Sequence, residues 1–187
     1  MLNDQFLEEV ATKRNQGVET VMYVIATIVM FASMLLAVLY LNVLTSMVAQ
    51  TGFSVNLLYP LVLMLVFAGT AVLLWLKRDA IKTEYEYAFT NGVLDFAQVF
   101  NNKKRKALGT MNLKNIEACG KVTSGSFQRY ITMPNIKRNN WFVNRDAELF
   151  YLYFSKDGQK RIIIIEPSEE MVKLITHAVQ PDVYQVN

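Results

Sequence analysis

VMYVIATIVMFASMLLAVLYLNVL (residues 21–44) and LLYPLVLMLVFAGTAVLLWL (residues 57–76) are the two segments that decide the fold of this chain. No Asp, Glu, Lys or Arg occurs anywhere in residues 21–76. A helix rises about 1.5 Å per residue and the hydrocarbon core of a bilayer is about 30 Å thick, so each segment is long enough to cross it. A spanning segment must satisfy its backbone hydrogen bonds internally, so we predict two transmembrane helices joined as a hairpin.

Two other interpretations of these segments fit less well. A buried hairpin of a soluble helical bundle would keep a charged face on each helix, and neither segment has one. A cleaved signal peptide has an apolar region of about 7–15 residues, and residues 21–44 exceed that length. Two retained spans are therefore predicted.

Basic residues flank the two segments and are absent from the loop between them. The loop, residues 45–56, has no Lys or Arg, whereas the flanks carry Lys13, Arg14, Lys77, Arg78 and Lys82. Because Lys and Arg are retained on the cytoplasmic side, we predict a two-pass protein of the cell membrane with both termini in the cytoplasm. The predicted parts are an N-terminal tail (residues 1–20), the hairpin (residues 21–76) and a cytoplasmic domain (residues 77–187).

The N-terminal tail has two interpretations. Leu2, Phe6, Leu7 and Val10 fall roughly on one helical face, which is typical of a short helix lying at the membrane interface. A frayed polar tail explains the same residues equally well.

Residues 77–187 begin with a β-hairpin pattern. Residues 84–90 alternate with period two, and Asn91-Gly92 follow, the pair favoured in a type I′ turn. Residues 93–100 are predicted as the return strand and residues 103–111 as a third strand.

The end of the chain predicts two more strands and a helix. Residues 148–155 and 161–166 are apolar runs joined by Asp157-Gly158, a second hairpin signal. A helix begins after Pro167 with acidic residues in its first turn, and Pro181 ends it. The predicted fold class is a two-span transmembrane hairpin plus an α+β, mainly β barrel closed by a C-terminal helix.

These segments resemble a known kind of domain. The run YEYAFTNGVL (residues 85–94), the basic residues 103–106 and MNLKNI (residues 111–116) are similar to the opening of bacterial pleckstrin-homology-like (PH-like) domains, which often follow paired transmembrane helices. The whole chain resembles a family of small, uncharacterised bacterial membrane proteins with this layout. Eukaryotic PH domains that bind phosphoinositides use basic residues around the first hairpin loop. Asn91-Gly92 offers none, so the resemblance does not carry that ligand over.

The stretch of residues 121–140 is the least regular part of the domain. The pattern predicts a loop of about 20 residues, and such long loops are either functional or mobile. Exposed aromatic and Arg side chains are typical of binding surfaces, so we predict that a protein partner or a second copy of the chain contacts Phe127, Arg129, Tyr130 and Trp141.

A basic run forms the second candidate site. Lys103, Lys104, Arg105 and Lys106 are adjacent. Three interpretations of this run are open: a contact with anionic lipid headgroups, a docking site for an acidic partner, or a solvated strand end that blocks edge pairing. From residue 77 onward the chain has 17 basic and 12 acidic residues, which suits an anionic membrane surface but is too mixed in sign for nucleic acid.

Nothing in the sequence specifies catalysis, a cofactor or a metal. Cys119 is the single cysteine, which excludes an internal disulfide, and His177 is the single histidine. The favoured function is a non-enzymatic, membrane-anchored interaction module. The alternative is a small membrane enzyme acting on a lipid or membrane-proximal substrate, with Glu84 and Glu86 as acids beside His177.

Overall fold

The computed structural model describes residues 5–185, which form two compact units. One unit is residues 15–82. The other combines the described residues on either side of it, 5–14 and 83–185. The helical unit is therefore inserted into the sequence of a single β-rich unit, which we call the PH-like domain.

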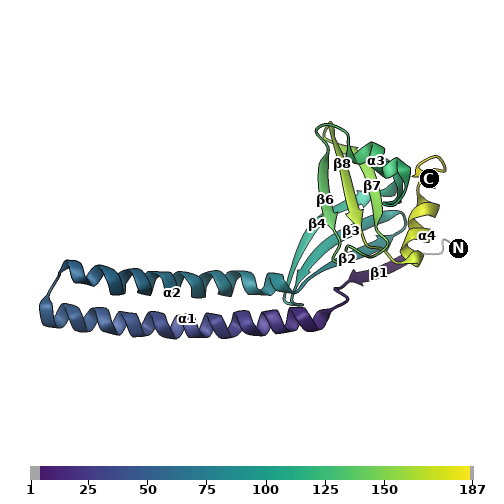
Figure 1. Cartoon of the computed structure of the whole chain (residues 1–187). Helices are drawn as coiled ribbons and strands as arrows, with labels where there is room; N and C mark the ends of the chain where they lie inside the picture. The colour runs from purple at the N-terminus through teal and green to yellow at the C-terminus, as the bar shows by residue number, and fades with distance from the viewer. Residues whose placement is uncertain (1–4, 186–187) are drawn as a thin grey trace. The chain divides into compact units, whose positions relative to one another are not determined.

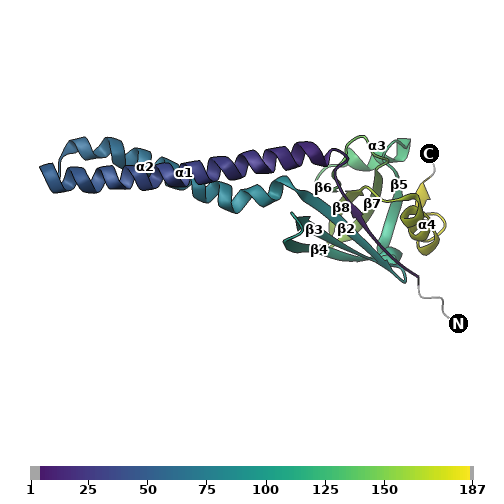
Figure 2. The same cartoon turned by 90° about the horizontal axis from the view of Figure 1, so that it is seen from below.

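The helical unit is an antiparallel hairpin. It contains α1 (Gln16–Thr51) and α2 (Leu58–Lys77), with short 3-10 helices η1 (Val55–Leu57) and η2 (Arg78–Ile81) after each. The two long helices run side by side in both views (Figures 1 and 2). At about 1.5 Å per residue, α1 is about 54 Å long and α2 about 30 Å, and both are apolar enough to cross a membrane.

The loop of the hairpin is shorter than predicted. Helix α1 continues to Thr51, because residues 45–51 contain no Gly or Pro, and Gly52 ends it with a φ of 67°. The span bounds are likewise wider than residues 21–76, since α1 already begins at Gln16.

Several polar side chains inside the hairpin bond to the backbone of their own helix, which suits an apolar environment. The hydroxyl of Thr27 donates to the Tyr23 carbonyl at 2.8 Å, and that of Thr70 donates to the Val66 carbonyl at 2.8 Å. The outer surface is apolar, with Leu35 62% exposed. Such a surface is unfavourable in water and favourable in lipid.

The first sheet contains a strand that the sequence pattern did not predict. Strand β1 (Phe6–Ala11) pairs antiparallel with β2 (Thr83–Thr90), so that Ala11 lies opposite Tyr85. Strands β3 (Val93–Phe100) and β4 (Lys104–Asn112) complete the order β1-β2-β3-β4. The prediction of a helix or frayed tail is wrong for residues 6–11, because the edge of β2 pairs with them; residues 1–4 lie outside the described residues.

The helical hairpin therefore connects two neighbouring strands. The chain leaves the sheet after Ala11 and returns at Thr83. Asn91 and Gly92, with φ of 48° and 84°, form the predicted turn, but it is the second connection of the sheet and not the first. The first connection of this sheet is the helical hairpin, so Asn91-Gly92 is not the first hairpin loop of the domain.

The second sheet has the strand order β6-β8-β7-β5-β9. Two of its pairings, β6 with β8 and β5 with β9, are parallel, and the others are antiparallel. Asp157 and Gly158 have φ of 54° and 72°, which confirms the second predicted hairpin. The strands are β5 (Ile116–Lys121), β6 (Lys137–Trp141), β7 (Phe150–Lys156), β8 (Gln159–Ile165) and β9 (Tyr184–Gln185).

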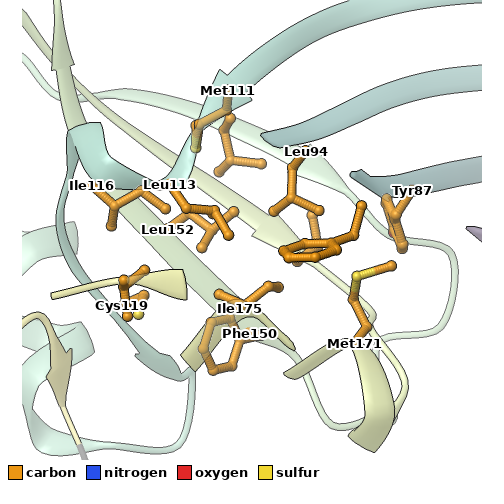
Figure 3. Packing of buried hydrophobic residues seen from close by; sticks show 14 of the residues in the cluster. Tyr87, Leu94, Met111, Leu113, Ile116, Cys119, Phe150, Leu152, Met171 and Ile175 are labelled. Carbon is orange, nitrogen blue, oxygen red and sulfur yellow. The ribbon is translucent and has the colours of Figure 1, made fainter. Parts of the chain in front are cut away.

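The two sheets share one hydrophobic core (Figure 3). Helix α4 (Glu169–Ala178), the predicted C-terminal helix, places Met171 and Ile175 in it. The Ser168 hydroxyl accepts a hydrogen bond from the Met171 N–H at 3.1 Å and caps the helix. The Glu9 carboxylate of β1 accepts one from the Ser168 N–H at 3.0 Å, which joins β1 to the start of α4. Burial raises the pKa of Glu9.

The predicted long loop at residues 121–140 is wrong. It contains helix α3 (Gly125–Ile131), and β6 begins before its end. The side chains of α3 cover the other face of the second sheet in a smaller core with Tyr151 and Ile162. The hydrophobic pattern of this segment is irregular because its few apolar residues are divided between a short helix and an edge strand.

A buried amide fixes the chain just before the hairpin. Asn144 is 7% exposed, and its Nδ2 donates to the Thr12 carbonyl at 2.9 Å and to the Glu166 carboxylate at 2.7 Å. Its Oδ1 accepts from the Arg14 N–H at 3.0 Å. Residues 12–14 are thereby held to the second sheet although they follow a strand of the first.

Candidate functional site

The predicted partner-binding residues do not form one exposed surface. Phe127 is 4% exposed and packs on Tyr151 with ring centroids 5.4 Å apart, so its prediction as an exposed aromatic is wrong. Tyr130 is half-buried against Tyr153, with ring centroids 4.4 Å apart. Arg129 is exposed on α3, and its role in binding stays a prediction.

Trp141 is separate from these three and lies at a cavity. It is the last residue of β6, half-buried, with its ring centroid 4.9 Å from that of Phe96 in β3. Its carbonyl accepts a hydrogen bond from the Tyr87 hydroxyl. These contacts hold Trp141 against the first sheet although its strand belongs to the second.

The cavity, which we call the seam cavity, has a volume of about 260 Å³. It lies between β4, an edge of the first sheet, and β6 with its neighbours β8 and β7 in the second. The register of β3 and β4 shifts between Phe96 and Ala97, which marks a β-bulge beside the cavity. The lining side chains that carry the argument are Phe96, Trp141, Asn112, Asn139, Lys156 and Arg161.

The seam cavity is electropositive. Lys156 and Arg161 supply two cations, and no acidic residue occurs among the described residues that line it. Within residues 5–185 the side chain of Arg161 makes no hydrogen bond or ion pair, and its Nε is buried without a partner. A buried guanidinium N–H without an acceptor is costly, and a cavity of this kind favours an anion.

Sequence reasoning missed Arg161 and Asn139, although a signal for Arg161 existed. Ile163 and Ile165 lie in the core between the sheets, whereas Ile162 and Ile164 face the smaller core with α3. Arg161 has the same parity as Ile163. A charged residue at an inward position of an apolar strand was therefore visible in the sequence.

The basic run lies at the end of the sheet where the hairpin is inserted. Lys104 is opposite Phe100 in β3, and Phe100 is opposite Thr83, the first residue of β2. All four basic residues are exposed, but Arg105 is paired with Glu86, with Nε and Oε2 2.7 Å apart. Lys103, Lys104 and Lys106 therefore provide the charge that is left for a ligand.

The residues of the alternative enzymatic prediction are not brought together. His177 is exposed on α4, and its Nδ1 lies 3.0 Å from the Lys173 carbonyl. Glu86 is in the ion pair with Arg105 across β3, as predicted for the outer face of a strand. No hydrogen bond or ion pair joins His177 to Glu84 or Glu86 among the described residues.

The single thiol lies in the core. Cys119 is fully buried, and burial raises its pKa to about 12. The structure assembles no group of three or more His, Cys, Asp or Glu side chains suited to a metal within residues 5–185.

These features define a class of protein: a PH-like domain of two β-sheets that carries an apolar helical hairpin between its first two strands. Comparison with known families agrees with this description. The model of the family described as Bacterial PH-like domain (DUF6106) matches residues 3–185, and the chain belongs to this family. No curated protein and no solved structure matches the chain.

Proposed function

We propose that this protein is a non-catalytic, two-pass membrane anchor that holds a PH-like interaction module at the cytoplasmic face of the cell membrane. One observation carries the proposal. The apolar hairpin connects β1 to β2, and these strands are hydrogen-bonded neighbours in one folded domain. Both ends of the hairpin must therefore be on the same side of a membrane that it enters.

The charge distribution supports the cytoplasmic side. The loop after α1, from Gly52 to η1, has no Lys or Arg, whereas Lys77, Arg78 and Lys82 follow α2 closely. Arg78 and Lys82 lie over the ring of Tyr23, with the Arg78 Cζ 5.6 Å and the Lys82 Nζ 5.3 Å from the ring centroid. Tyrosine with adjacent cations is typical of the membrane–water interface.

The position of the basic run supports a contact with lipid headgroups. Five residues separate Lys77 of α2 from Thr83 of β2, and an extended chain of this length spans at most about 20 Å. Lys103, Lys104 and Lys106 are at the same end of the sheet as Thr83. Each basic side chain near an anionic surface contributes about 1 kcal/mol.

The domain itself supports binding in place of catalysis. Two sheets with one core, and α4 packed into it, are consistent with the closed barrel implied by the family. The groups with functional character, the seam cavity and the basic run, suit recognition of charged ligands. We expect an acidic protein partner, a second copy or anionic lipid at these surfaces, and no nucleic acid.

Cysteine labelling in intact cells tests the topology. The variant Ser54→Cys places a thiol at the exposed turn after α1, and Lys114→Cys places one at an exposed position of the 3-10 helix η3 (Leu113–Asn115) of the domain. A membrane-impermeant maleimide should modify the first and not the second until the cells are opened. Buried Cys119 makes the parent chain a suitable background. Labelling of Lys114→Cys from outside would reverse the orientation, and labelling of neither would place the hairpin loop inside.

A further inference from the structure

The seam cavity offers a ligand site that membrane attachment alone does not require. It lies between strands of both sheets, and its lining combines aromatic rings, carboxamides and two cations. The residue that stands out is Arg161. Its strand is buried beyond it, from Ile162 to Ile165, and the alternation of the strand directs it inward with Ile163.

The surroundings of Arg161 lack the acceptor that a guanidinium normally has. Two other basic residues of the same sheet each have an acidic partner. Lys160, next to Arg161, is paired with Glu117, with Nζ and Oε2 2.7 Å apart. Lys121 is paired with Glu148, with Nζ and Oε2 2.8 Å apart. Arg161 has no such partner among the described residues, and its Nε is buried. Lys156, the second cation that lines the cavity, is exposed at the end of β7. The missing acceptor is the main clue to the ligand.

We propose that the seam cavity binds the oxyanion of a small organic molecule, a phosphate or carboxylate group, with Arg161 as its principal contact. A planar guanidinium matches both oxyanions with paired hydrogen bonds. Lys156 adds a second positive charge, and the carboxamide of Asn139 supplies a neutral donor. The rings of Trp141 and Phe96 provide an apolar wall for the carbon atoms next to the oxyanion.

The size of the cavity limits the ligand. Its volume of about 260 Å³ is below the roughly 300–1,000 Å³ of sites for drug-sized molecules. An oxyanion with a few carbon atoms fits this limit. The oxyanion comes either from a soluble molecule or from a lipid headgroup, and both present the same chemistry to Arg161. The inference stands independently of the basic run, which lies on other residues.

Tryptophan fluorescence of the full-length protein in detergent gives a direct readout. The chain has two tryptophans, so Trp75→Phe in α2 leaves Trp141, at the cavity wall, as the reporter. The soluble probes are sn-glycerol 3-phosphate, inorganic phosphate and butyrate. The lipid probe is phosphatidylglycerol in mixed micelles, and micelles of phosphatidylcholine are its control. We expect a saturable change with at least one anionic probe, together with a higher Tm in its presence.

Two substitutions on one strand provide a matched comparison. Arg161→Gln should weaken the binding at least about tenfold, since a hydrogen bond to a charged group contributes about that factor or more. Lys160→Gln removes the same charge from the opposite face of β8 and should change binding less than about twofold. The ligand-free Tm of Arg161→Gln should equal or exceed that of the parent, whereas a purely structural arginine would lower it. If Arg161→Gln does not fold, Lys156→Gln at the exposed end of β7 replaces it and should weaken binding several-fold.

The outcomes distinguish the two sources of the oxyanion, a soluble molecule and a lipid headgroup. Binding of a soluble probe that depends on Arg161 supports a soluble ligand, and Arg161-dependent binding of phosphatidylglycerol alone supports a headgroup. Absence of binding by every probe, or equal binding by Arg161→Gln and Lys160→Gln, overturns the proposal. Either result leaves the topology experiment unaffected, so the two proposals fail separately.

Discussion

The insertion of the hairpin between β1 and β2 predicts that the PH-like domain can be made without its membrane part, but only if β1 is kept. The perturbation is to replace residues 15–82 by an eight-residue Gly-Ser linker, giving the hairpin-excised domain. Ala11 and Tyr85 are directly opposite in the sheet, so the linker has to bridge two neighbouring strands. Eight residues span up to about 26 Å, which is ample. The domain should be soluble and unfold cooperatively.

The matched comparison is the fragment of residues 83–187, which lacks β1. Six register pairs between β1 and β2 are lost, together with the packing of Leu7 and Ala11 on the core and the contact of Glu9 with the Ser168 N–H. Loss of these two apolar side chains corresponds to roughly 2–4 kcal/mol. For a domain of this size, that lowers the Tm by on the order of 10 °C.

Thermal unfolding followed by circular dichroism measures the difference between the two proteins. The hairpin-excised domain should unfold at the higher temperature with a larger denaturant m-value, because it buries more surface. Equal Tm values would refute the assignment of residues 6–11 to the domain. An excised domain without a cooperative transition would refute the view that the domain folds independently of the hairpin.

Three further predictions concern single features of the domain. Asn144→Ala should destabilise it by about 2–4 kcal/mol in urea unfolding, because it removes a buried amide that bonds to the Thr12 carbonyl, the Arg14 N–H and the Glu166 carboxylate. Asn140→Ala on the exposed side of β6 should stay within about 0.5 kcal/mol, and similar values for both variants would contradict this role of Asn144. Burial raises the pKa of Cys119 to about 12, so Cys119 should resist maleimide at pH 8 in the native protein and react in urea. Fast labelling of the native protein would show that the core opens. Replacing Lys103, Lys104 and Lys106 by Ser in the hairpin-excised domain should abolish its sedimentation with anionic vesicles at low salt and leave its Tm unchanged. Undiminished sedimentation would assign these residues to a solvated strand end.

The sequence by itself was sufficient for the elements whose determinants are local. The apolar segments predicted two long helices because the absence of charge over 56 residues needs no tertiary information. The turns at Asn91-Gly92 and Asp157-Gly158 were predicted correctly because the left-handed backbone conformation favours these residues wherever they occur. Helix α4 was predicted from its acidic first turn and from the proline that follows it. The order of strands followed by a helix also supported the family, which the match over residues 3–185 confirmed.

Tertiary structure decided what depends on a distant partner. Residues 6–11 have no strong local preference, and they form a strand because the edge of β2, more than 70 residues away in sequence, is open to pair with them. Phe127 is buried because the second sheet offers an apolar outer face to α3, which no local pattern of residues 121–140 reveals. The seam cavity is likewise made by strands of two sheets, so Trp141, Asn139 and Arg161 meet only in the folded domain. Backbone propensity and hydropathy act over a few residues, whereas pairing of edges and enclosure of cavities depend on how the sheets are packed.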